Sequence, residues 1–353
     1  MDYKTYAEIS TQFTALQKTV KHILNQQEEL RSFLQNSGAR KLLVLGCGSS
    51  FSVGKSIEGC AEMVLGLESV CIPAGDYMQN AAEYRKIAQD SLILALSRSG
   101  ETHEVINAIQ ESKHYFNSKV LSIVCAEKTT LEKKSDYTIE LPWAFDESVC
   151  QTRSVTNLFA ACRLVLSVWD YDQETIEDIS KFALEGDEFI QKAEPLLVEI
   201  ADEEWENAFV LADGEISGVA EEAALALTEI AYTPSHYNHL LDVRHGPILL
   251  VGAKTLVVAL MNGDKKGYQK VLIEDLVNRG AKVVVLHTPQ YDHVAGTRLE
   301  LALNTEHATS VIAGFQLLTA TQLLAYHKSL SKGLNPDQPK GLDAWIRLDS
   351  VEN

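Results

Sequence analysis

Hydrophobic and polar residues recur along the chain in two rhythms, and each rhythm predicts a different kind of element. Between residues 4 and 36 the apolar positions have helical spacing: Ile9, Phe13, Leu16, Val20, Ile23, Leu24, Leu30 and Phe33. This spacing predicts two helices or one long helix, which ends at Asn36-Ser37-Gly38. From Lys41 onward the helical spacing gives way to short continuous apolar runs, which are typical of buried parallel strands.

The apolar runs of the first half alternate with helical patterns. We expect strands over 41–45, 68–73, 91–96, 119–125 and 136–141. We expect helices over about 50–66 and over 76–86, a third that begins near residue 105, and a fourth that ends at about residue 170. Such alternation predicts a parallel sheet with helices on both faces, in which ligands bind at the carboxyl ends of the strands. Residues 171–204 are acidic and predict a solvated pair of connecting helices.

The pattern of the first half returns in the second half. Residues 209–216 align with 43–50, and residues 255–260 align with 91–96, which suggests a duplicated domain. The predicted fold class is therefore α/β, with two tandem doubly wound parallel-sheet domains of flavodoxin-like type and an N-terminal helical segment. We place the segments at 1–36 (N-terminal helices), 37–170 (first domain), 171–204 (connecting helices), 205–334 (second domain) and 335–353 (tail).

Composition and charge narrow the functional classes. The formal net charge of −18 argues against nucleic acid and against an anionic membrane as partners. All six cysteines lie in the first half without paired spacing, which favours free thiols in a reducing compartment over disulfides or a zinc site. The sequence has no signal peptide and no apolar run of the ~18 residues that a membrane span needs. We therefore expect a cytoplasmic protein.

The stretch Ser97-Arg98-Ser99-Gly100-Glu101-Thr102 is the first candidate site, because it joins a predicted buried strand to a predicted helix. The backbone N–H groups and the dipole at a helix N-terminus attract anions, and hydroxyls add neutral donors. Ser97, Ser99 and Thr102 are therefore candidates for binding a phosphate, and Gly100 allows the backbone to come close. The alternative is an ordinary helix start in which Ser99 is the cap. From this stretch alone the two interpretations are equally good.

A second glycine- and hydroxyl-rich turn, Gly46-Cys47-Gly48-Ser49-Ser50, follows the first predicted strand. It lacks the dinucleotide pattern, because Phe51 stands where that pattern continues. Gly48, Ser49 and Ser50 are further candidates for phosphate binding.

Another polar stretch, Ser148–Ser154, precedes a predicted helix. Gln151, Thr152 and Arg153 are candidates for ligand contact there. A capped helix start explains them about equally well.

The second copy of the phosphate turn has different chemistry. It contains Met261-Asn262-Gly263-Asp264, so the hydroxyls are gone and an acid is present that would repel a phosphate. This asymmetry favours a functional role for the serines of the first copy.

The second half contributes candidate acid–base groups instead. Glu222 and Glu229 lie seven residues apart on one face of a predicted helix over 219–232, among small apolar residues that would raise a carboxyl pKa. His245 precedes Gly246-Pro247 at a chain reversal. From the residues alone, a solvent-facing Glu and a hydrogen-bonded turn His are the simpler interpretation. The other histidines show no spacing typical of metal ligands.

Taken together, these motifs resemble the double sugar-isomerase (SIS) domain proteins, including the isomerase half of glucosamine-6-phosphate synthase. The resemblance is carried by GCGSS (46–50), SRSGET (97–102), QTRS (151–154), Thr228-Glu229-Ile230, RHGP (244–247) and the tail Asn335–Pro339, in the family's order over nearly the whole chain. The chain opens with Met1 and a helix rather than with a nucleophilic Cys at position 2, so glutamine is not the expected ammonia donor.

The resemblance implies a role for each matched residue. Ser50, Ser97, Ser99 and Thr102 would hold a sugar phosphate. Glu229 would move a proton between C1 and C2, and His245 would assist ring opening. Because this histidine often comes from the neighbouring subunit in the family, a homodimer with the site at the subunit interface is expected.

The chain departs from the synthase pattern at two lysines. Ala226 stands one turn before Glu229, where the synthase has a lysine, and Ala344 occupies the position of the lysine in the tail. Lys340 and Arg347 are nearby but do not align with it. Lys340 and Arg98 remain candidate substrate contacts.

We therefore expect an amino-sugar-6-phosphate deaminase/isomerase that uses no metal, nucleotide or other cofactor. Related deglycases of phosphorylated fructosamines typically have aromatic residues before the His-Gly pair, where this chain has Val243-Arg244. A fructosamine-6-phosphate deglycase is one alternative, and a non-catalytic sugar-phosphate sensor is another.

Overall fold

A computed structural model describes residues 3–261, 263, 266–288, 291–303, 310–346 and 348. The chain forms two compact units. One contains residues 11–184 and 343–353, and is called the N-unit below. The other contains residues 1–10 and 185–342, and is called the C-unit.

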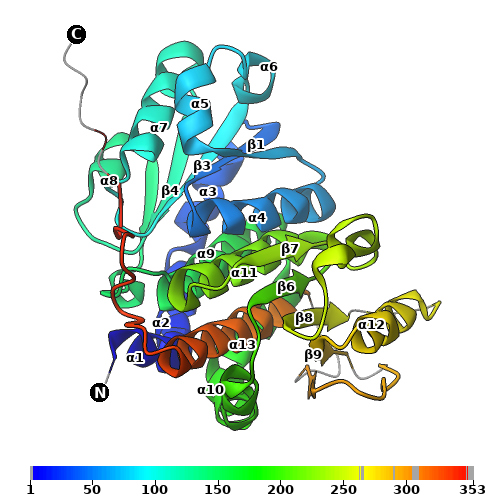
Figure 1. Ribbon diagram of the computed structural model, residues 1–353. Helices are drawn as coiled ribbons and strands as arrows, with labels where there is room; N and C mark the ends of the chain where they lie inside the picture. The colour runs from blue at the N-terminus through cyan, green and yellow to red at the C-terminus, as the bar shows by residue number, and fades with distance from the viewer. Residues whose placement is uncertain are drawn as a thin grey trace. The chain divides into compact units, whose positions relative to one another are not determined.

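The N-unit is built on a parallel sheet of five strands in the order β2-β1-β3-β4-β5 (Figure 1). Its strands are β1 (Lys41–Gly46), β2 (Glu68–Pro73), β3 (Ser91–Ser97), β4 (Lys119–Val124) and β5 (Tyr137–Glu140). Every neighbouring pair is parallel, as the alternation of apolar runs and helices predicts. The central strand β3 is buried at every residue.

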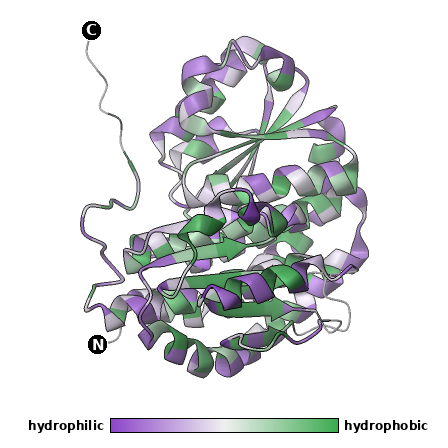
Figure 2. Ribbon diagram, turned by 45° about the vertical axis from the view of Figure 1, so that its right-hand side comes forward, coloured by the Kyte–Doolittle hydropathy of each residue, from purple (hydrophilic) through white to green (hydrophobic). Residues whose placement is uncertain are grey.

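Helices cover both faces of this sheet, and the two-residue period of the strands decides which side chains they meet. Leu43 and Leu45 pack with α5 and α7, whereas Val44 faces Gly54 of α4. The helices are α2 (Gln12–Asn25), α3 (Gln27–Asn36), α4 (Ser49–Leu65), α5 (Ala74–Asn80), α6 (Arg85–Ala88), α7 (His103–Phe116), α8 (Thr130–Lys134) and α9 (Arg153–Asp170), with the 3₁₀ turn η1 (Pro142–Ala144). In Figure 2 the hydrophobic colour runs along the strands, and the helices alternate between the two colours.

The C-unit has the same topology. Its parallel sheet has the order β7-β6-β8-β9-β10, with β6 (Asn207–Leu211), β7 (Ser235–Asn238), β8 (Thr255–Met261), β9 (Lys282–His287) and β10 (Leu299–Ala302). The registers correspond as well, because Asn207 pairs with Thr255 where Lys41 pairs with Ser91 in the N-unit. The repeat predicted from the sequence is confirmed.

The helices of the C-unit also divide between the sheet faces. The apolar side chains of α12 pack on Phe209, Val257 and Val283, whereas α11 and α13 pack together and contact β6 and β8. The helices are α1 (Lys4–Ser10), α10 (Gln173–Asp202), α11 (Ser217–Ala231), α12 (Tyr268–Asn278) and α13 (Ser310–Ser331), with 3₁₀ turns η2 (Gly214–Ile216), η3 (Leu241–Arg244) and η4 (Pro247–Leu250). Helix α10 belongs to both units: its residues up to Leu184 are part of the N-unit, and those from Glu185 onward are part of the C-unit.

Three helical predictions need correction. The N-terminal stretch forms three helices, with breaks at Thr11 and Gln26, rather than one or two. The helix predicted over 76–86 is interrupted by a turn at residues 81–84 between α5 and α6, and a 2.5 Å hydrogen bond from the Tyr84 hydroxyl to the Asp76 carboxylate stabilises this turn.

The predicted pair of connecting helices is instead the single helix α10, which continues through Pro195. Its apolar stripe, which includes Ile176, Phe182 and Ile190, is buried and extends along its length. This burial explains how one helix persists where the acidic composition favoured two solvated helices.

All six cysteines are free thiols, as predicted. Within the part of the chain that the structure describes, no helix is both long and apolar enough to cross a lipid bilayer.

Candidate functional site

The loop Ser97–Thr102 leaves the carboxyl end of β3 and leads into α7. The Ser97 Oγ atom lies 3.1 Å from Thr102 Oγ1 and accepts a 3.0 Å hydrogen bond from the Gly100 N–H. The Ser99 Oγ atom accepts a hydrogen bond of 3.1 Å from the Glu101 N–H. The loop thus brings the predicted hydroxyls together at the N-terminus of a helix, where backbone N–H groups attract anions.

The capping alternative assigned the wrong residue to the start of this helix. The N-cap of α7 is Thr102, and its side chain makes no cap hydrogen bond to the helix. Ser99 bonds within the turn instead. The hydroxyls therefore belong to the loop and do not cap the helix. The first N–H groups of α7 have no partner within the helix, as at every helix start.

Gly100 is required by the backbone at this point. Its φ of +65° favours glycine, and a Cβ built there would lie 2.5 Å from Thr129 Cβ. The Gly100 carbonyl accepts a 3.1 Å hydrogen bond from the Leu131 N–H. The Glu101 carboxylate accepts further bonds from the Thr130 N–H (2.7 Å) and hydroxyl (2.8 Å). These anchors fix the loop, and sequence reasoning missed the part played by Glu101.

The second predicted turn lies at the same edge of the sheet, because β1 and β3 are neighbouring strands. Gly48 has φ of +52° and is the N-cap of α4, so Ser49 and Ser50 form its first turn. Both serines are buried. Burial, with the nearby Glu104 carboxylate, raises the pKa of the Cys47 thiol to about 12, so this cysteine stays protonated near neutral pH.

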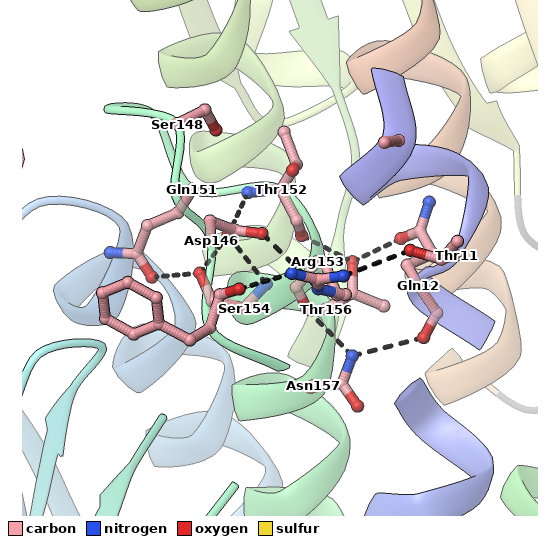
Figure 3. Close-up of polar contacts among 12 residues, drawn as sticks. Thr11, Gln12, Asp146, Ser148, Gln151, Thr152, Arg153, Ser154, Thr156 and Asn157 are labelled. Atoms are coloured by element: carbon pink, nitrogen blue, oxygen red, sulfur yellow. Dashed lines mark hydrogen bonds and ion pairs between the residues drawn. The ribbon is translucent and has the colours of Figure 1, made fainter. Parts of the chain in front are cut away.

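The start of α9 is organised by Asp146, which is 1% exposed (Figure 3). Its carboxylate accepts hydrogen bonds of 2.9 Å from the N–H groups of Thr152 and Ser154, and a further bond from the Ser154 hydroxyl. Gln151 Oε1 accepts from the Ser154 hydroxyl at 3.1 Å. Asp146 is separated from this helix by a loop, so no local pattern in the sequence identified it.

Arg153 is held inside the N-unit. Its guanidinium donates to the Phe145 carbonyl and to Thr11 Oγ1 at 3.2 Å, and Nε lies 3.9 Å from the Asp146 carboxylate. Thr152 is fully buried at the N-cap. For these two residues the helix-start interpretation accounts for the contacts seen.

Arg98 is also committed to backbone groups. The residue is 4% exposed. Its guanidinium donates hydrogen bonds to the carbonyls of Ser148 (3.1 Å), Val149 (2.9 Å) and Ala344 (2.6 Å). The side chain therefore points away from the hydroxyls that flank it in the sequence.

In the C-unit, helix α11 carries Glu222 and Glu229. Glu222 is buried and Glu229 is half-buried. The helix ends at Tyr232, with φ of +48°, where Lys332 Nζ donates to the Ala231 carbonyl at 2.9 Å. Glu229 thus lies on the last turn of a helix whose end is fixed.

The tail is tied to the C-unit at two points. The Asp337 carboxylate accepts from the N–H groups of Lys4 (3.0 Å) and Thr5 (2.8 Å) and so caps α1. Lys340 is exposed, and its carbonyl accepts a 2.9 Å hydrogen bond from the Tyr232 hydroxyl. The family-like motif Asn335–Pro339 therefore has a structural role at Asp337, which the sequence did not reveal.

His245 lies between the turns η3 and η4, as the Gly-Pro sequence predicted. Its N–H donates to the Asp242 carbonyl at 2.8 Å, and Gly246 has φ of +129°. The imidazole is exposed, and Leu249 and Leu250 close by are 82% and 60% exposed. Three residues of the sequence argument, Asn262, Asp264 and Arg347, lie outside the described residues.

The SIS domain model matches residues 37–168 and 203–331. A glutamine--fructose-6-phosphate aminotransferase [isomerizing] of Sulfurisphaera tokodaii is 25% identical over 347 residues, which are 97% of this chain and 56% of that protein. The chain therefore spans about half the length of the curated relatives it matches.

Two solved structures are similar over nearly the whole chain. Glucosamine-6-phosphate deaminase from Thermotoga maritima has a TM-score of 0.80 and 25% identity, and the match covers 98% of this chain and 100% of that one. Tagatose-6-phosphate ketose/aldose isomerase from Escherichia coli has a TM-score of 0.86 and 22% identity, with 100% and 98% covered. The second of these likenesses concerns the fold alone.

Proposed function

The chain belongs to the SIS domain family, and we propose that it is a phosphosugar isomerase/deaminase acting on an amino-sugar 6-phosphate. The observation that carries the proposal is the loop Ser97–Thr102, whose hydroxyls gather at the start of α7. A phosphate dianion needs several donors fixed before it arrives, and a loop anchored at Gly100 and Glu101 supplies them. Ser50, on the neighbouring strand's turn, adds a further hydroxyl.

The two sequence repeats have separate roles in this proposal. Residues 37–170 form the phosphate-binding SIS domain, and residues 205–334 form the SIS domain that carries Glu229 and His245. The neighbouring deaminase, by its printed name, acts on glucosamine 6-phosphate. That name and the intact Glu229 and His245 support an amino-sugar substrate.

The reaction begins with ring opening, in which His245 moves a proton between the ring oxygen and the C1 hydroxyl. Glu229 then removes the proton from C2 of the open-chain aldehyde while the C1 oxygen takes up a proton from water, which gives an enolamine. Return of the C2 proton to C1, with loss of one amine proton to water, produces an imine at C2. Water adds to C2 and ammonia leaves, so the products are a ketose 6-phosphate and ammonia.

Every step uses protein side chains and water, so the proposal calls for no metal or nucleotide. His245 would serve the site of a second copy in a homodimer. The exposure of His245 beside the apolar Leu249 and Leu250 supports that role, because exposed apolar side chains together mark interaction surfaces. The six free thiols are in keeping with the predicted cytoplasmic location.

The test is a panel of 6-phosphates: glucosamine, fructosamine, tagatose and glucose. Each is followed for ammonia release and for aldose–ketose conversion. We expect ammonia and ketose 6-phosphate from glucosamine 6-phosphate. Release of glucose 6-phosphate from fructosamine 6-phosphate would instead identify a deglycase, and binding without turnover would identify a sensor. Failure of every sugar phosphate to bind would overturn the proposal entirely.

A further inference from the structure

Arg98 has the position expected of a phosphate ligand but not the contacts. It lies between Ser97 and Ser99, and an arginine next to two serines in a phosphate loop is a natural bidentate partner for the anion. In the structure its guanidinium is 2.6–3.1 Å from three backbone carbonyls, at Ser148, Val149 and Ala344. It also lies over the Phe145 ring, with Cζ 5.9 Å from the centroid.

We infer that Arg98 is a positioning residue that ties the phosphate loop to the C-terminal tail at Ala344, and that it supports phosphate binding by holding the loop in place rather than by contact with the anion. This inference rests on the proposed phosphate site. Three hydrogen bonds from one planar group fix its orientation, and turning it toward the loop would break all three.

The backbone of Arg98 is held as firmly as its side chain. Its carbonyl accepts a 3.0 Å hydrogen bond from the Cys125 N–H, just beyond the end of β4. The residue is thus bonded on one side to the sheet and on the other to residues 148–149 and the tail. A change in the tail at Ala344 therefore acts directly on the residue between the two candidate phosphate-binding serines.

A double-mutant test separates this role from general support of the fold. Arg98→Lys keeps the charge but loses the planar fork, and a chain ending at Leu342 lacks the Ala344 acceptor. The substitution, the shortened chain and the combination of the two are each measured. Calorimetric titration gives the affinity for inorganic phosphate, and steady-state kinetics gives KM and kcat for the amino-sugar phosphate. Melting temperatures check that every variant is folded.

We expect Arg98→Lys to weaken phosphate binding by about tenfold in the full chain, since a charge-assisted hydrogen bond is worth about that factor. The rise should appear in KM, with kcat changed less than about threefold. In the shortened chain the same substitution should weaken phosphate binding only about two- to threefold, because the truncation has already removed one of the hydrogen bonds of Arg98.

The matched control is Arg153→Lys. Arg153 also bonds a backbone carbonyl, at Phe145, but has no hydrogen bond to the described tail residues, so its effect should be equal in both chains. An equal effect of Arg98→Lys in the two chains, or phosphate binding unchanged by it, would overturn the inference. Absence of turnover would count against the proposed function only, because the titration with phosphate does not depend on the reaction.

Discussion

The two parallel sheets share one topology and differ at the turns that follow their strands. In the N-unit, β3 leads into α7 through a hydroxyl-rich loop, whereas in the C-unit β8 ends at the buried Met261 and α12 begins at Tyr268. The helices that follow the first strand of each sheet differ as well: α4 begins with two serines, whereas α11 carries Glu222 and Glu229 farther along its length.

This comparison teaches that the scaffold and the chemistry vary independently. The registers of the two sheets correspond, so the strands deliver their turns to equivalent places. What differs is the polar side chains that the following elements carry: hydroxyls at the starts of α4 and α7 in the N-unit, and carboxylates in the middle and the last turn of α11 in the C-unit.

The largest expected effect is on the proposed base. Glu229→Gln should lower kcat by about 10²- to 10⁴-fold while sugar-phosphate binding is retained, because general base catalysis contributes about that factor. Steady-state kinetics with a binding titration measures both quantities. Glu222→Gln on the same helix is the control, and its kcat should stay within a few-fold of the parent. The reverse order of the two effects would mean that the base is Glu222.

Serines of the two repeats should behave differently on substitution. Ser99→Ala and Ser50→Ala should each raise KM by about 10- to 100-fold, since each removes a hydrogen bond to a charged group. Ser217→Ala, at the first position of α11 in the second repeat, is the control and should leave KM unchanged. Equal effects in both repeats would contradict the assignment of phosphate binding to the N-unit alone.

Two glycines give a matched comparison of backbone strain. Gly100 and Gly263 have φ of +65° and +72°, but only at Gly100 would a Cβ meet neighbouring atoms. Gly263→Ala should cost about 1 kcal/mol of unfolding free energy from the positive φ alone. Gly100→Ala should cost about 2 kcal/mol or more, because Thr129 must also move. Urea denaturation distinguishes them, and equal costs would show that the loop accommodates the methyl group.

The smallest effect concerns a carboxylate beside the last strand of the N-unit. Burial raises the pKa of Asp136, but hydrogen bonds from Lys113, Lys119 and the Val120 N–H outweigh it, so the pKa is below its usual value. The stabilisation is present above the unfolded pKa of about 4 and is lost as the pH falls through the folded pKa.

Asp136→Asn should therefore destabilise the protein by about 1 kcal/mol at pH 7, less at high salt, and the difference should disappear in acid. Urea titrations over a pH series give this curve. A gap that did not shrink as the pH fell through the acid range would show that the ion pairs are not its source.

Much of the fold was predictable because the strands are continuous apolar runs with a helix between each pair. The gathering of hydroxyls at the start of α7 was predictable too, since Ser97, Ser99 and Thr102 are neighbours in the sequence. The predicted helix over 76–86 failed at residues 81–84, where a hydrogen bond from the Tyr84 hydroxyl to the Asp76 carboxylate stabilises a turn.

Contacts between residues far apart in the sequence were not predictable from local patterns. Arg98 bonds Ala344, and Asp337 caps a helix that begins at Lys4. In each case the partner is chosen by how the chain folds back, and the residue type alone permits several roles. The same limit made Arg98 a candidate ligand in the sequence and an anchor in the structure.

The central claim is that one repeat of this chain binds phosphate and the other does not. Calorimetric titration with glucosamine 6-phosphate, on the parent and on a Ser97→Ala/Ser99→Ala variant, measures it directly through the stoichiometry. The account predicts one equivalent bound per chain in the parent and loss of binding, by at least about 100-fold, in the variant. Two equivalents per chain, or undiminished binding by the variant, would contradict it.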